Sequence, residues 1–169
     1  TLEEGLGKRV PLARILTVIE KKQSDLEYAR SLQLDGRRDQ VDNPDVERVA
    51  TVLSLGVSRK ELATLFGFDY KAPNHMRVIA TEILGYGKAM GYDPELLERV
   101  VSTGLTQEAF TSDWSYFIKV ASESRRKDIP DSLVAETAIN VLLEHGALDE
   151  LIGELGVSIT PSASPPEDN

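Results

Sequence analysis

The chain has 169 residues, of which 41% are hydrophobic and 28% are charged, and its net charge is −9 at pH 7. These proportions are ordinary for one globular domain that buries a real core. The sequence has no cysteine, which excludes disulfides, thiolate metal sites and cysteine nucleophiles. No apolar run reaches the ~18 residues of a membrane helix, and the first residues do not resemble a signal peptide. We therefore expect a cytoplasmic protein with no membrane partner.

The negative charge is unevenly distributed along the chain. Residues 1–43 have no net charge, residues 44–90 carry +1, and residues 91–169 carry −10. An acidic half repels nucleic acids, and it suits either a basic protein partner or a well-solvated surface.

The first helix is expected to begin at Pro11, because proline is favoured at the first helical position. Apolar residues then recur at helical spacing, at Leu12, Ile15, Leu16, Ile19, Leu26 and Ala29. Lys22 and Gln23 interrupt this stripe, which predicts a helix that is half covered by the core and projects at its far end. The 11–34 helix is thus a candidate for self-association or for binding a protein partner, since Leu12, Ile19 and Leu26 lie seven residues apart. An ordinary core helix is the alternative.

The next two helices are predicted from their capping residues. A second helix is expected from Asn43-Pro44 to about Gly56. Ser58 and Glu61 form the pattern of a capping box, which predicts the start of a third helix. Gly67 is expected to end that helix in the left-handed conformation.

The remaining helices follow from apolar spacing and from proline and glycine. A fourth helix is predicted near Pro73, a fifth from Asp93-Pro94 to Gly104, a seventh from Pro130 to Gly146, and a short eighth at residues 148–155. The sixth is predicted to begin at Thr106 and to bury an aromatic stripe, Phe110, Trp114, Phe117, Ile118 and Ala121. Residues 157–169, rich in proline and serine, are expected to be a disordered tail. The fold class is therefore all-α: residues 1–156 are expected to form a single domain, a compact bundle of about seven to eight helices.

We find no catalytic or metal-binding pattern in the sequence. The two histidines, His75 and His145, are on different predicted helices, and neither has a second ligand at metal spacing. Glu136 and Glu144 are expected on a solvent-exposed helix face. P-loop, GxSxG, HExxH and GxGxxG motifs are absent. No catalytic residue, cofactor or metal is predicted, and a non-enzyme is expected.

The segment SRKELATLFGF resembles the first helix and turn of a helix-turn-helix, with Ala63 where the second helix would cross and Gly67 in the turn. Together with the helix starts at Asn43-Pro44 and Asp93-Pro94, residues 43–110 resemble partition proteins of the ParB-like type. The resemblance implies a helix-turn-helix-like corner within residues 44–90 and DNA as a partner.

The resemblance also implies which residues would contact DNA. The recognition helix would be the one near Pro73, and residues 58–84 would form the motif. The candidate nucleic-acid-binding residues are Arg59, Lys60, Lys71, Asn74, His75 and Arg77. Pro73 departs from the pattern because it delays the start of the second helix, and the local charge of +1 is low for a DNA-binding segment. An ordinary helical corner is the alternative.

A second resemblance uses some of the same residues. Gly67, Lys71, Asn74 and Met76, with the later segment 91–94, are similar to the helical domain of β-hydroxyacid dehydrogenases, which implies that Lys71 and Asn74 line an active site. No nucleotide-binding half precedes these residues, so the resemblance implies a non-catalytic relative or a fragment. Three hypotheses follow: a regulatory protein that binds DNA through residues 58–84, a protein-binding helical module with an acidic face, and a helical domain related to these dehydrogenases.

Overall fold

The computed structural model describes residues 11–33, 43–67 and 71–159. These residues form eight α-helices and one 3-10 helix, and they contain no strand, which confirms the predicted all-α class. The elements are α2 (Leu12–Gln33), α3 (Asn43–Ser54), α4 (Arg59–Phe66), α5 (Asn74–Ala89), α6 (Pro94–Thr106), η1 (Ser112–Tyr116), α7 (Phe117–Arg126), α8 (Asp131–Leu143) and α9 (Leu148–Leu155).

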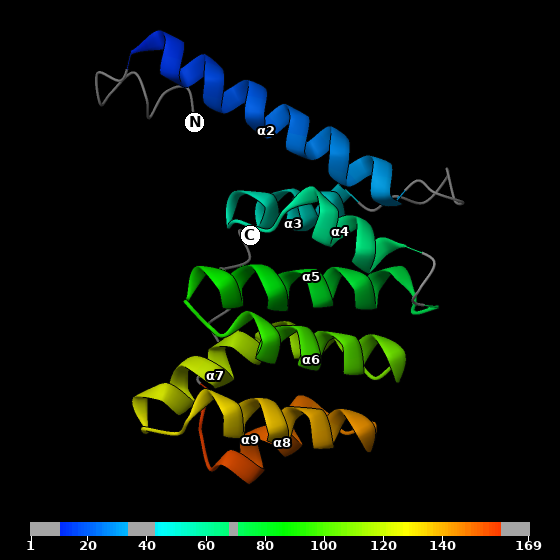
Figure 1. The fold of residues 1–169 in the computed structure, drawn as a ribbon, viewed down its shortest axis with the longest axis vertical. Helices are drawn as coiled ribbons and strands as arrows, with labels where there is room; N and C mark the ends of the chain where they lie inside the picture. Colours follow the sequence, from blue (N-terminus) through cyan, green and yellow to red (C-terminus); the bar gives the residue numbers. More distant parts are fainter. Residues whose placement is uncertain (1–10, 34–42, 68–70, 160–169) are drawn as a thin grey trace, which may run out of the picture.

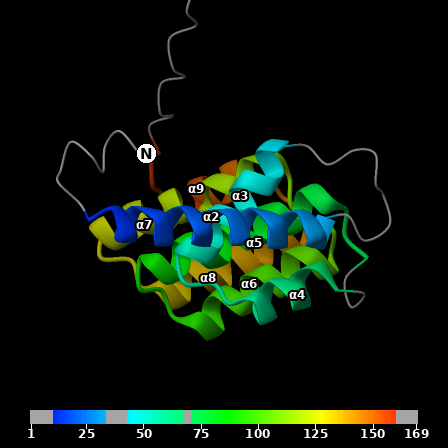
Figure 2. The ribbon, with the colours of Figure 1, turned by 90° about the horizontal axis from the view of Figure 1, so that it is seen from above.

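The helices are stacked in successive layers around α5. Helix α5 packs against α3, α4, α6, α7 and η1, and it buries residues on most of its circumference. Figure 1 shows α2 at one end of the stack and α8 with α9 at the other. Seen from above, α2 lies across the other helices (Figure 2). The core is continuous from Ala29 of α2 to Leu151 of α9.

Most helix starts lie where their local chemistry predicts them. At the start of α4, the Glu61 amide donates to Ser58 Oγ at 3.2 Å and the Ser58 amide donates to Glu61 Oε2 at 2.9 Å, which is the predicted capping box. Helix α5 begins at Asn74, with Pro73 as its N-cap. The left-handed conformation predicted for Gly67 is wrong, because its backbone is extended (φ −69°, ψ 178°).

The predicted sixth helix from Thr106 is also wrong. Helix α6 continues through Gly104 to Thr106, and the aromatic residues lie on η1, on α7 and in the segment before them. Gly104 permits this path because it has no side chain, so the ring of Phe110 can pack directly against its backbone. A Cβ at this position would collide with that ring. The turn is completed by Glu108, with φ of 52°, and by the Ala109 amide, which donates to Gly104 O at 2.9 Å.

The aromatic residues are buried as predicted, although their helix is not. Trp114 packs edge-on against Phe110, with ring centroids 5.9 Å apart, and stacks on Phe117 at 6.2 Å. All three rings belong to the core. The apolar periodicity thus identified the core side chains correctly even where the backbone is not one helix.

The described chain continues past α9 to Ile159. Val157 is buried and Ile159 packs against the core, so the first residues of the predicted tail contact the bundle. Residues 160–169 lie outside the described residues, as do residues 1–10 and 34–42.

Candidate interaction surfaces

Helices α4 and α5, which occupy the predicted helix-turn-helix, run antiparallel along their lengths. The Lys88 side chain near the end of α5 pairs with Glu61 at the start of α4. At the other end, Arg77 Nη1 donates to the Phe66 carbonyl at 2.6 Å, and Figure 1 shows the two helices running in opposite directions. Residues 67–73 separate them, whereas the turn of a helix-turn-helix has about three or four residues and its helices cross at a steep angle. Ala63 is exposed, so α5 does not cross α4 at that residue.

The predicted DNA-contacting residues do not form one surface. Lys71, Asn74 and His75 are exposed together at the start of α5. Lys71 and Asn74 are also the two residues that the dehydrogenase resemblance implies for an active site. Lys60 is exposed too, but it adjoins Glu61 and thus lies near the opposite end of α5.

Arg77 is held against the backbone at the junction of α4 and α5. Besides its bond to Phe66, its Nε donates to the Ala72 carbonyl at 3.0 Å. These bonds satisfy carbonyls at the end of α4 and in the following turn, groups that would otherwise lack partners. Local sequence patterns carry no signal for this role, because it depends on where the chain returns after residues 67–73.

The Arg59 side chain contacts three residues of α2. Its Nη2 donates to Ser24 Oγ at 2.7 Å and lies 3.6 Å from Asp25 Oδ1, while the guanidinium lies 4.8 Å from the centre of the Tyr28 ring. The Tyr28 hydroxyl donates to the Arg59 carbonyl at 2.6 Å. Burial raises the pKa of Tyr28, and the nearby guanidinium opposes that shift in part. These contacts, with buried Asp25 and Ala29, anchor the C-terminal half of α2.

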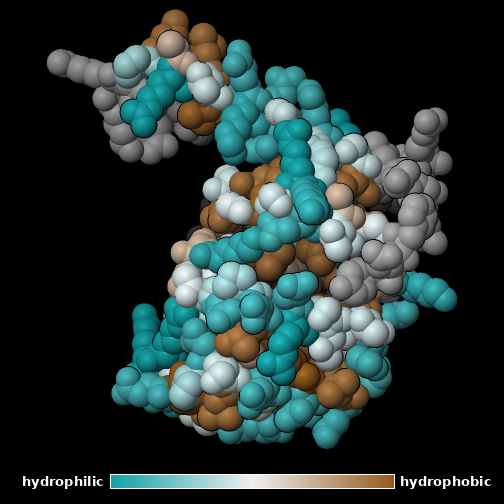
Figure 3. Space-filling view, viewed as in Figure 1, coloured by the Kyte–Doolittle hydropathy of each residue, from teal (hydrophilic) through white to brown (hydrophobic). Residues whose placement is uncertain are grey.

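The half of α2 that projects is the N-terminal one (residues 12–22) and not the far end that the interrupted apolar stripe predicts, because Asp25 and Ala29, beyond the interruption, are buried against the bundle. The exposed fractions of its apolar side chains are 61% for Leu12, 51% for Leu16, 62% for Val18 and 40% for Ile19. In Figure 3 hydrophobic surface gathers on this half at the upper left, where it stands clear of the layers below. A groove of about 410 Å³ lies between α2 and α3 at its base, from Val18 to Leu26 on one side and Glu47 to Ser54 on the other.

A second hollow, which we name the tyrosine cleft, has a volume of about 570 Å³. Its lining comes from α3, α5, η1 and α7: Arg48, Glu82, Tyr86, Met90, Ser115, Tyr116, Ile118, Lys119 and Ser122. Tyr86, Met90 and Tyr116 are among the large hydrophobic side chains that are exposed. No sequence pattern indicated this cleft, since it forms only where four elements meet.

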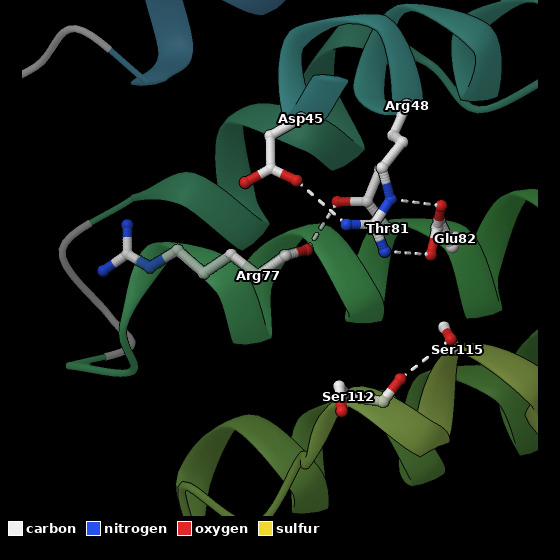
Figure 4. A network of polar contacts seen from close by, with 7 residues as sticks. All are labelled: Asp45, Arg48, Arg77, Thr81, Glu82, Ser112 and Ser115. Carbon is white, nitrogen blue, oxygen red and sulfur yellow. Dashed lines mark hydrogen bonds and ion pairs between the residues drawn. The ribbon is translucent and has the colours of Figure 1, made fainter. Parts of the chain in front are cut away.

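One wall of the tyrosine cleft is fixed by an ion-pair network between α3 and α5 (Figure 4). Arg48 donates to both Glu82 carboxylate oxygens at 2.7 Å and to Asp45 Oδ1 at 2.9 Å. The hydrogen bonds to Glu82 raise the pKa of Arg48, against the effect of burial. Bidentate pairing of this kind is both strong and directional, so the network holds α3 in register with α5.

The described residues contain no group of three or more side chains that could hold a metal ion. His75 and His145 are both exposed, and Glu136 and Glu144 are exposed as predicted. Within the same ranges no helix is long and apolar enough to cross a membrane.

Two surfaces therefore stand out on the described chain, the projecting half of α2 and the tyrosine cleft. No family model, curated protein or solved structure matches this chain.

Proposed function

We propose that this chain is a helical interaction protein that acts without catalysis and binds another protein through the N-terminal half of α2. The observation that carries the proposal is the exposure of four aliphatic side chains on one projecting half-helix, at 40–62% each. Contiguous exposed apolar surface of this kind marks interaction sites in proteins.

The surface has the shape that a partner helix requires. Leu12, Leu16 and Ile19 follow the i, i+4, i+7 spacing that aligns side chains along one helix face. Below them, the groove between α2 and α3 is bordered by the apolar residues Val18, Leu26 and Ala50. Burying an aliphatic side chain completely contributes about 1.5–3 kcal/mol, so a helix laid along this face would gain several such contributions.

We infer that the partner is a second copy of this chain. Two identical stripes related by a twofold axis bury each other's leucines, and such self-complementary dimers are the commonest assembly of soluble proteins. The basic side chains Lys21 and Lys22 and the acidic Glu20 lie at the end of the stripe. Both signs of charge therefore border the surface, which suits contact between like chains better than a strongly charged edge would.

Leu16→Glu is expected to weaken the dimer by about a hundredfold or more. Each substitution removes about 1.5–3 kcal/mol of apolar burial, and the twofold axis doubles the loss. Sedimentation velocity over a range of protein concentrations measures the association constant directly.

Leu133→Glu is the matched control for this experiment. Leu133 is 49% exposed on α8, at the other end of the stack, so its substitution should leave association unchanged. If the original chain is a monomer at every concentration, or if both variants weaken the dimer equally, self-association through α2 is disproved.

DNA binding is the second candidate, and it is favoured by the joint exposure of Lys71, Asn74 and His75 at the start of α5. It predicts that the chain retards random duplex DNA in a gel at low salt, that salt abolishes the shift, and that Lys71→Ala with Asn74→Ala weakens it. Arg77→Ala is unsuitable as a test because Arg77 bonds the backbone. The separation of the predicted contact residues between two places and the chain's charge of −9 weigh against this candidate, and absence of retardation at low salt would disprove it.

A further inference from the structure

The tyrosine cleft has a composition that fits an extended proline-containing segment. Tyr86 and Tyr116 line it with exposed rings, and Met90 and Ile118 add apolar surface between them. Grooves lined by aromatic rings are the sites where proline-rich segments bind in the polyproline II conformation, whose rigidity lowers the entropy lost on binding. Ser115 of η1 lies across from the Arg48–Glu82 pair of α3 and α5 (Figure 4), so one side of the cleft also offers polar groups.

The described chain ends beside this cleft. Ile159 lines a small hollow of about 180 Å³ together with Lys119, Ser122 and Glu123. Lys119 and Ser122 also line the tyrosine cleft, so the two hollows share a border. Ile159, the last described residue, therefore lies at the border of the cleft.

The ten residues that follow, 160–169, have the sequence TPSASPPEDN, with three prolines, two acidic residues and no basic residue. We propose that residues 160–166 lie in the tyrosine cleft of the same chain, with the prolines against Tyr86 and Tyr116. This inference is independent of association through α2, because no residue of α2 lines the tyrosine cleft.

The length of the segment agrees with the length of the cleft. From Ile159 to Ser164 a polyproline II segment extends about 16 Å, at ~3.1 Å per residue. From Ser122 to Ser115 the helical path is about 10 Å, at ~1.5 Å per residue. Residues 160–166 are thus long enough to pass along α7 and to reach η1 without a break in the chain.

The chain contains no cysteine, so a pair of introduced cysteines gives a clean proximity test in the full chain. Ser164→Cys with Ser115→Cys places one thiol in the segment and one in the cleft. Ser164→Cys with Arg126→Cys is the matched control: Arg126 is highly exposed on α7, and its neighbour Lys127 bonds the Gly156 carbonyl at 2.5 Å, so it is close to the chain exit without lining the cleft.

Under mild oxidation we expect the first pair to form its disulfide about tenfold faster than the second, which corresponds to a segment held in the cleft in about nine molecules of ten. Adding Tyr116→Ser to both pairs should remove the difference. Far-UV circular dichroism checks that each variant remains folded. Equal rates for the two pairs, or a difference that survives Tyr116→Ser, would overturn the proposal. A disulfide that joins two chains instead of closing within one would also overturn it, because the segment would then occupy the cleft of a neighbour.

Discussion

Trp114→Ala is expected to lower the free energy of unfolding by about 3–5 kcal/mol, the usual cost of removing a large buried aromatic side chain. The Trp114 side chain is 0% exposed and lies between Phe110 and Phe117, in the segment that joins α6 to α7. A loss of this size is a large part of the 5–15 kcal/mol that stabilises a typical domain. Urea denaturation followed by far-UV circular dichroism measures it, since the variant has no tryptophan left to report by fluorescence.

Tyr116→Ala is the control for this prediction. Tyr116 lies two residues further along the same 3-10 helix but is 47% exposed. Its substitution should cost less than about 0.5 kcal/mol for the exposed ring itself, and release of residues 160–166 from the cleft would add about 1.4 kcal/mol, which is still well below the loss for Trp114. If the two variants were equally destabilised, η1 itself and not the burial of Trp114 would be responsible. The same measurement shows whether Tyr116 can be replaced safely when the tyrosine cleft is tested.

Gly104→Val is expected to destabilise the protein by about 3 kcal/mol, the upper part of the usual range for overpacking a core. Its new side chain would occupy the space of the Phe110 ring, which is fully buried and cannot move outward. The single tryptophan, Trp114, contacts Phe110, so its fluorescence during urea denaturation reports unfolding at the place of the change.

Gly153→Val is the matched comparison, because Gly153 is also within a helix, α9, but a Cβ there meets nothing within 4 Å. That variant should differ from the original chain by less than about 0.5 kcal/mol. Equal destabilisation by both valines would mean that contact with Phe110 does not decide the effect, since helix propensity alone slightly favours valine over glycine.

The sequence predicts those features of the fold that depend on neighbouring residues. The capping box at Ser58 and the proline before α5 act within one helical turn, so their effects can be recognised without knowing the tertiary structure. Gly104 shows the limit of this approach. A glycine often ends a helix, but here the helix continues and the missing side chain admits a ring from six residues further on.

The candidate surfaces also differ in how far the sequence predicts them, because some depend on neighbouring residues and others on distant parts of the chain. The interruption in the apolar stripe of α2 predicts that part of the helix projects, but it does not show that the apolar N-terminal half is the exposed part. The roles of Arg59 and Arg77 depend on which helix lies beside them and in which direction it runs. Apolar spacing predicts buried residues on both α4 and α5, but it does not show whether the two helices cross or run antiparallel. The tyrosine cleft depends on four elements at once and leaves no local pattern.

The two halves of α2 differ in what holds them, and this difference bears on the strength of any complex that the helix forms. A short helix alone is marginal in water because its first turn is costly to nucleate. In this chain the turn around Asp25 and Ala29 is already fixed against α3 and α4, so the residues before it extend an existing helix. The binding face is therefore preorganised, and association loses less conformational entropy than it would with a segment that folds on binding.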